Sequence, residues 1–227
     1  MIQASRSTGL RDHVYEHVKQ LLFTGAYKPG MQIEVEKIAN QLSVSRQPVM
    51  DALKRLNFDG FVTIVPQVGC HIRIYRPEEV SDFFLIVSEV EPLAVELAAK
   101  RATPDNIARM QNISDQIGSV TLSQRSAQEK AELYRTLNRQ LHGEFGLAAK
   151  SGPVVELVTG FGDRCDFFIA SANRPIFFER LVTAHEEHEL IIKAIARGDG
   201  KAGATIMRRH ILAIEKRLRE PSLETIE

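Results

Sequence analysis

Four of the seven histidines lie between residues 142 and 210, and two of them are spaced to face each other across a helical hairpin. His188 stands ten residues before the Gly198-Asp199-Gly200 turn, and His210 stands ten residues after it. At a rise of about 1.5 Å per residue, antiparallel helices joined by this turn place both imidazoles at a similar height. Imidazole is a good ligand for zinc, nickel, copper and iron. A core histidine is also commonly only a hydrogen-bonding residue, and the spacing alone leaves that alternative open.

An earlier helix could supply further ligands to the same site. Asn138 and His142 are four residues apart, so both side chains leave the same face of a helix. His185, one turn before His188, is expected in the pocket wall or behind the ligands. Glu187 flanks His188 and is predicted to point away from its face. Without a well-placed carboxylate, acid–base catalysis at such a site would lack its proton carrier.

A second set of polar residues follows Ser43-Val44, where a new helix is predicted to begin. Ser45 suits the N-cap, and Pro48 falls in the first turn, where a missing N–H does no harm. One face of this helix is apolar, and the other carries Arg46, Gln47, Met50 and Lys54. The guanidinium fork of Arg46 can bind a phosphate or a guanine edge. Ser45 and Gln47 can donate hydrogen bonds from the helix N-terminus, where the helix dipole favours anions.

The segments around this helix predict how it is presented. Residues 35–42 form a short amphipathic helix across a tight turn, which gives helix-turn-helix geometry. Residues 61–65 and 70–74 read as two strands joined by a turn, the form of a wing, and Gly69 would let the backbone of the wing approach a groove closely. The alternative is a helical hairpin packed beside a β-hairpin, with no role in binding nucleic acid.

The whole chain is predicted to be mostly α-helical and to contain two domains. Its 227 residues suffice for two modest cores. Residues 1–75 form the winged helix-turn-helix domain, with residues 10–24 as its supporting helix. Residues 76–227 form an all-α antiparallel bundle of six or seven helices, in which Pro92 is expected to kink the first helix or divide it.

Charge and composition fit a DNA reader joined to a regulatory module. Residues 1–75 carry nine Lys/Arg against six Asp/Glu, and the remainder carries 20 against 23, so the two parts have net charges of +3 and −3. Cys70 and Cys165 are far apart, which indicates neither a disulfide framework nor a zinc ribbon. No apolar run is long enough to span a membrane, and no signal-peptide core is present, so a cytoplasmic protein is expected.

Several motifs resemble those of GntR-family transcription regulators of the FadR subfamily, which carry a ligand-binding domain called FCD. The motifs are PGMQI, ANQLSVSRQPVMDALKRL, GFVTIVPQVG and the later EH…AIARGD…H. The resemblance extends from about Leu10 to about Leu218. It implies a winged helix-turn-helix followed by a helical effector-binding and dimerisation domain. It also implies that Arg11 contacts phosphate. The chain departs from the family at Met50, where a second arginine is usual; an apolar contact to a thymine methyl could replace it.

The resemblance also implies a metal site. Metal-binding FCD domains place an Asp or Asn, a His four residues later, and two further His near the C-terminus, a pattern matched here by Asn138, His142, His188 and His210. The expected cofactor is a divalent ion, Zn²⁺ or Ni²⁺. Coordination positions left open could hold the carboxylate of a metabolite. The arginine often found just before the LE pair of the first long helix is absent, so a carboxylate would rely on the metal or another side chain.

The expected function is therefore that of a DNA-binding transcriptional regulator, acting as a repressor. As a homodimer it would bind a two-fold operator, because one recognition helix and one wing bury little surface. A small carboxylate bound in the metal-containing bundle would control its operator affinity. The alternative is a His-rich helical metallohydrolase with an accessory domain. A third possibility is a metal-buffering or scaffold protein, which would leave the VSRQPVMDAL motif without an explanation.

Overall fold

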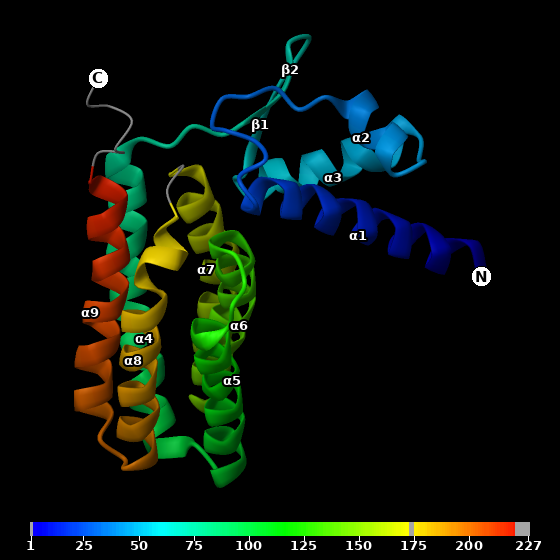
Figure 1. Ribbon diagram of the computed structural model, residues 1–227. Coiled ribbons are helices and arrows are strands. Elements are labelled where there is room, and N and C mark those ends of the chain that lie inside the picture. The colour runs from blue at the N-terminus through cyan, green and yellow to red at the C-terminus, as the bar shows by residue number, and fades with distance from the viewer. Residues whose placement is uncertain (1, 173–174, 221–227) are drawn as a thin grey trace. The chain divides into compact units, whose positions relative to one another are not determined.

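The computed structural model describes residues 2–172 and 175–220, and the predicted fold class is confirmed (Figure 1). The chain divides into two compact units, Met1–Tyr75 and Arg76–Glu227. The first unit contains three helices and a small two-stranded sheet, and the described part of the second contains helices only. Within the described ranges, no helix combines the length and apolar character that crossing a membrane requires.

The helices of the first unit pack on a common core. They are α1 (Ile2–Phe23), α2 (Val35–Gln41) and α3 (Arg46–Phe58), with α3 in contact with both of the others. α1 begins before the predicted start at Leu10. Its residues Val14 and Val18 are fully buried, as are Val49 and Leu53 of α3. This packing leaves the polar face of α3 exposed, because the apolar stripe of an amphipathic helix is the one that turns inward.

The sheet of the first unit is the predicted wing. β1 (Val62–Val65) pairs antiparallel with β2 (Gly69–Ile72), in the register that joins Val62 to Ile72 and Val65 to Gly69. An isolated bridge between Gln32 and His71 adds a third short segment. Gly69 has a φ of +133°, and a Cβ there would lie 2.7 Å from Nε2 of Gln32. The turn therefore requires glycine at this position.

The second unit is an antiparallel bundle of long helices (Figure 1). In chain order they are α4 (Pro77–Arg101), α5 (Pro104–Leu122), α6 (Ala127–Ala148), α7 (Gly152–Ser171), α8 (Ile176–Ala196) and α9 (Gly200–Arg219). α9 packs against α4 and α8, and α6 contacts α4, α5, α7 and α8. Side chains from α4, α6, α8 and α9 can therefore meet inside the bundle.

Local signals set the helix boundaries. Thr103 and Ser126 accept hydrogen bonds from backbone N–H groups of the first turns of α5 and α6, which is the capping-box arrangement. Asp199 caps α9 in a similar way, and Gly198, with a φ of +73°, ends α8. Pro92 does not divide the first helix of the bundle, because α4 continues through it from Pro77 to Arg101.

Candidate metal centre and nucleic-acid interface

Three histidines from three helices converge inside the bundle. His142 of α6, His188 of α8 and His210 of α9 each offer a ring nitrogen, and these atoms all lie within 4.8 Å of one another. The ring centroids of His188 and His210 are 4.6 Å apart. All three residues are buried, and His188 is fully enclosed. The equal offset of His188 and His210 from the α8–α9 turn brings them together, as expected for antiparallel neighbours.

Two buried glutamates fix the outer nitrogens of this triad. Nδ1 of His142 lies 2.7 Å from Oε2 of Glu91 on α4, and Nδ1 of His210 lies 2.8 Å from Oε2 of Glu187. A carboxylate is an acceptor when it is ionised, so these contacts place a proton on each Nδ1. The Nε2 atoms are then left as lone-pair donors. Metal-binding histidines usually have such an outer partner, which sets the tautomer and the orientation of the ring.

Burial disfavours the charged form of two of the three imidazoles, His188 and His210. Burial, with His210 and His142 close by, lowers the pKa of His188 well below its usual value. Burial also lowers the pKa of His210, although the hydrogen bond to Glu187 opposes this. For Glu187 burial disfavours ionisation, but the hydrogen bond from His210 and nearby positive charges outweigh it and lower its pKa. Neutral imidazole is the form that binds a metal.

The residues present fit a metal ion. Nε2 of His142 and His210 and both ring nitrogens of His188 are buried without a hydrogen-bond partner among the described residues. Buried polar atoms are normally paired, and an unpaired one costs about 1–3 kcal/mol. Three ring nitrogens within 4.8 Å of one another are compatible with one Zn²⁺ or similar ion, for which Zn–N bonds are about 2.0–2.1 Å.

The two remaining candidates each stand about one helical turn before a histidine of the triad, Asn138 before His142 and His185 before His188. Asn138 is half-buried on α6, and its Oδ1 accepts a hydrogen bond of 3.0 Å from the hydroxyl of Tyr134. His185 lies against α5, where its Nδ1 is 3.4 Å from Oγ of Ser114 and its Nε2 faces the backbone of Gly118. An added Cβ at Gly118 would lie 3.1 Å from that nitrogen, so the absence of a side chain there makes room for His185.

The polar face of α3 carries the candidate DNA-reading residues. Arg46 is two-thirds exposed, and its Nη1 lies 2.9 Å from Oε1 of Glu36 on α2. Arg46, Met50 and Gly69 line a groove of about 610 Å³ between α3 and the wing. The exposed Val68 lies on the wing side of the same groove. The structure thus brings these three candidates to one concave surface.

The other candidates lie around Asp51 on α3 or at the start of that helix. Nε of Arg11 is 3.6 Å and Nζ of Lys54 is 3.8 Å from the carboxylate of Asp51, and Nε2 of Gln47 donates a hydrogen bond of 2.8 Å to it. Ser45 is the exposed N-cap residue of α3 and makes no side-chain capping bond. These exposed charge pairs are weak, so phosphate could displace Asp51 from them.

Comparison with known proteins identifies both units. Residues 10–72 match the family described as bacterial regulatory proteins, gntR family, and residues 82–213 match the FCD domain. The second match alone spans more than half of the chain. The protein belongs to the GntR family of transcriptional regulators that carry an FCD domain.

A relative agrees with this assignment, and two solved structures share the fold. This GntR regulator is 27% identical to the Nta operon transcriptional regulator of Aminobacter aminovorans over 82% of its own chain and 83% of the relative. Its fold is similar to that of Escherichia coli McbR/YncC, with a TM-score of 0.71 and 23% identity over 92% and 98% of the two chains. A putative GntR regulator from Rhodococcus sp. RHA1 gives a TM-score of 0.73 at 18% identity, over 94% and 97%.

The GntR assignment does not support the alternative interpretation as a metallohydrolase; the protein is a regulator and not an enzyme. The structure shows that two buried carboxylates at the triad are already engaged by its histidines. Glu91 and Glu187 are each hydrogen-bonded to the outer nitrogen of a histidine. Glu187, predicted only to point away from the face of His188, is directed toward His210 on α9.

Proposed function

We propose that this GntR regulator is a repressor that binds a two-fold operator as a homodimer. Arg46 and Met50 of α3 would read base edges, and Gly69 would bring the wing backbone close to the duplex. Arg11 and Lys54 would contact phosphates. Ser45 and Gln47 would donate hydrogen bonds to the DNA from the N-terminal end of α3. The groove shared by Arg46, Met50 and Gly69 supports the proposal. A regulator bound to the bacterial chromosome acts in the cytoplasm.

Met50 sets an expectation about the operator. Because it is an unbranched apolar side chain, it cannot form the bidentate bond to guanine that an arginine would make. It lines the groove together with the apolar wing residues Val65 and Val68. Such a surface suits the methyl group of thymine. The proposed half-site therefore contains thymine where Met50 enters the major groove.

The bundle is proposed to hold one divalent ion, Zn²⁺ or Ni²⁺. His142, His188 and His210 would bind it through ring nitrogens, with Asn138 as a fourth ligand through its amide oxygen, while His185 would line the effector pocket. The observation that carries this proposal is the convergence of three buried imidazoles whose inner nitrogens have no protein partner among the described residues. When bound, the ion supplies an electrophilic position that attracts an anionic oxygen of a metabolite.

The effector is proposed to be a small carboxylic acid. Imidazole binds a metal in its neutral form, so the ion would keep its positive charge and favour an anion as a further ligand. The carboxylates of Glu91 and Glu187 are held on the outer side of the ligand rings and do not compete for that place. Binding of the acid would lower operator affinity and so release repression.

The dimer is proposed to form through α4. Leu85, Ile86 and Leu93 lie on the outer side of this helix and are 46–56% exposed. Large apolar side chains grouped on one exposed helix face are typical of an interaction surface. A second copy of the chain could cover the same residues symmetrically, as a two-fold interface requires.

The test of the proposal is a mobility-shift assay on DNA upstream of the protein's own gene, with and without bound Zn²⁺. Zinc content is measured in parallel by elemental analysis. Protein loaded with zinc should bind one upstream fragment more tightly than a scrambled fragment of equal length, and an acid from a metabolite panel should weaken this binding. Equal affinity for both fragments would contradict sequence-specific repression. Absence of zinc after dialysis against zinc would contradict the metal site.

A further inference from the structure

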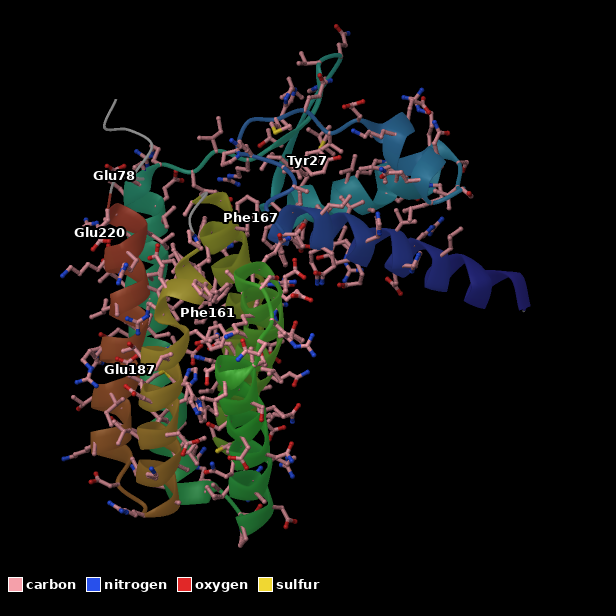
Figure 2. All side chains as sticks on the ribbon, in the orientation of Figure 1. Tyr27, Glu78, Phe161, Phe167, Glu187 and Glu220 are labelled. Atoms are coloured by element: carbon pink, nitrogen blue, oxygen red, sulfur yellow. The ribbon has the colours of Figure 1, made fainter. Side chains whose placement is uncertain are left out.

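Arg180 is a largely buried cation that is linked to the histidine triad through Glu187. It lies on α8, about two turns before His188, and its side chain is only 12% exposed. Its Nη2 donates a hydrogen bond of 2.7 Å to Oε2 of Glu187, the same oxygen that accepts from Nδ1 of His210. A single carboxylate oxygen of Glu187 therefore lies between the guanidinium of Arg180 and the imidazole of His210, one of the proposed metal ligands. Glu187, labelled in Figure 2, joins the two groups between α8 and α9.

The guanidinium is not fully paired. Its Nε is buried and has no hydrogen-bond partner among the described residues. The second carboxylate oxygen of Glu187, Oε1, does not complete a fork with Arg180; it lies 3.7 Å from Nε of Arg209 on the outer side. A buried charged donor without a partner costs more than the 1–3 kcal/mol of a neutral one. A residue that served only to hold Glu187 would gain from a two-point contact, which this geometry does not make.

The unpaired atoms are concentrated in one place. Seven buried side-chain nitrogens in the described parts of the chain have no partner. Five of the seven belong to His142, Arg180, His188 and His210. Arg180 is linked to the triad by geometry, because Oε2 of Glu187 accepts a hydrogen bond from its Nη2 and also one from Nδ1 of His210. Unmade hydrogen bonds grouped in this way indicate a ligand site rather than isolated packing defects.

The chemistry of the unpaired Nε–H group of Arg180 defines what it can bind. A guanidinium N–H in a buried site binds an anionic oxygen, and a carboxylate is the partner that its planar geometry suits. We propose that Arg180 is the anion anchor of the effector site: its Nε–H donates to a carboxylate oxygen of the effector, while other oxygens of the same molecule face the histidine triad. This inference rests on the proposed function of the bundle as a carboxylate sensor. It adds a second recognition point, which favours acids that carry more than one oxygen-bearing group.

The experiment compares carboxylate binding by zinc-loaded full-length proteins. Arg180→Gln removes the charge and the Nε–H, and Arg180→Lys keeps a charge but cannot place a donor at Nε. Arg209→Gln is the matched control, because Arg209 approaches the same glutamate from the solvent side and is 65% exposed. The probes are acetate, succinate and malate, and their affinities are measured by calorimetry. Zinc content and circular dichroism are recorded for each variant.

We expect Arg180→Gln to retain zinc and helix content and to bind succinate and malate about 10- to 100-fold more weakly, the range of a hydrogen bond to a charged group. Arg180→Lys should recover only part of this loss, and Arg209→Gln should bind as the wild type does. Acetate is too small to reach both Arg180 and the histidine triad. The Arg180→Gln substitution should therefore reduce the affinity for acetate less than the affinity for the diacids.

The possible failures separate the two proposals. If wild-type protein binds the diacids and Arg180→Gln binds them equally well, the anchor is wrong and the carboxylate sensor stands. If Arg180→Gln loses its zinc, the residue serves to hold Glu187 against His210, and the anchor is again wrong. If wild-type zinc-loaded protein binds none of the three acids, the carboxylate class of the proposed effector fails and the anchor fails with it.

Discussion

Nδ1 of His210 donates a hydrogen bond of 2.8 Å to Oε2 of Glu187, and this one contact orients the buried imidazole. The side chain of His210 is only 1% exposed, so no solvent can replace the glutamate as its partner. Because Nδ1 carries the proton, the lone pair of Nε2 points to the opposite side of the ring. Glu187 and the metal are thus expected to occupy opposite sides of the same ring.

The first prediction is that Glu187→Ala weakens metal binding. Loss of the outer hydrogen bond leaves His210 without a fixed tautomer or orientation, and such changes typically cost about 10- to 100-fold in metal affinity. Zinc affinity is measured by competition with a chelator. Glu186→Ala is the matched control, since Glu186 is exposed on the preceding position of α8. Equal zinc affinity in the Glu187 variant and this control would contradict the role given to the contact.

Much of this architecture follows from local sequence signals, whereas the glutamate partners do not. The α8–α9 turn and equal spacing predicted that His188 and His210 would lie close together, because an antiparallel hairpin has one simple geometry. The sequence places Glu187 off the face of His188, because a residue adjacent to His188 lies about 100° around the helix from it. Its true partner is on α9, and only the packing of α8 against α9 determines that contact. Glu91 is on α4, 51 positions from His142, and nothing in the local pattern links the two.

The continuity of α4 is a second case where packing outweighs a local rule. Proline normally interrupts a helix because it lacks an N–H and crowds the carbonyl four residues earlier. Pro92 is nevertheless buried within α4, which packs along α9. Neighbouring buried residues such as Ala94 and Val95 contribute core contacts on both sides of the proline. Tertiary packing of this kind can offset the local cost, which the sequence pattern alone does not measure.

The second prediction concerns the stability of the metal-free protein. His188 is fully buried, and neither of its ring nitrogens has a partner among the described residues, so it should destabilise the fold when no ion is bound. His188→Leu should therefore raise the free energy of unfolding of the metal-free protein by about 1–3 kcal/mol. Thermal denaturation after chelator treatment measures this change.

The same variant should lose its response to metal. A ligand at 100 times its Kd stabilises the native state by about 2.7 kcal/mol, so Zn²⁺ should raise the Tm of the wild type. It should leave the Tm of His188→Leu unchanged. His13→Leu is the control, because His13 is exposed on α1. A metal-free His188→Leu protein that is less stable than the wild type would contradict the assignment.

The third prediction separates base reading from phosphate contact. Arg46→Ala should cost about 1–3 kcal/mol in operator binding if Arg46 forms a bidentate bond with a base. Arg11→Ala should weaken binding to all sequences alike and reduce the slope of log affinity against log salt by about one. Fluorescence anisotropy with operator and scrambled DNA at several salt concentrations measures both effects.

Arg55→Ala provides the control for both substitutions. Arg55 lies on α3, as Arg46 does, but its guanidinium lies over the ring of Tyr15 and pairs with Asp12. The Arg55 variant should keep its operator affinity and its salt dependence. Wild-type operator affinity in a correctly folded Arg46→Ala protein would remove Arg46 from the DNA-reading surface.

The fourth prediction is that Ile86→Glu separates the dimer. Ile86 is 56% exposed on the outer face of α4, and a buried, unpaired carboxylate at an apolar interface would oppose association. Light scattering after size exclusion should show a monomer, with operator affinity reduced accordingly. Leu122→Glu is the control, since Leu122 is 83% exposed at the end of α5. A dimer that persists in Ile86→Glu would place the interface elsewhere.

The last prediction is that effector and operator DNA each change the affinity of the protein for the other by one common factor. The two units are joined through Tyr75 and Arg76, with little free chain between them. The hydroxyl of Tyr75 donates a hydrogen bond of 2.7 Å to the backbone oxygen of Gly60, and Arg76 is the N-cap residue of α4. A small displacement of α4 on effector binding could therefore reach the DNA-binding unit through the backbone. Typical coupling of about 1–3 kcal/mol corresponds to a 5- to 150-fold change in affinity.

Organic and sugar acids are screened by thermal shift on zinc-loaded protein, and each acid that binds is titrated with and without operator. Because linkage is reciprocal, operator must weaken the binding of the true effector by the factor by which that effector weakens operator binding. An acid whose affinity ignores the operator is not the regulatory ligand, and if every acid that binds behaves in this way, the control model for the bundle is wrong.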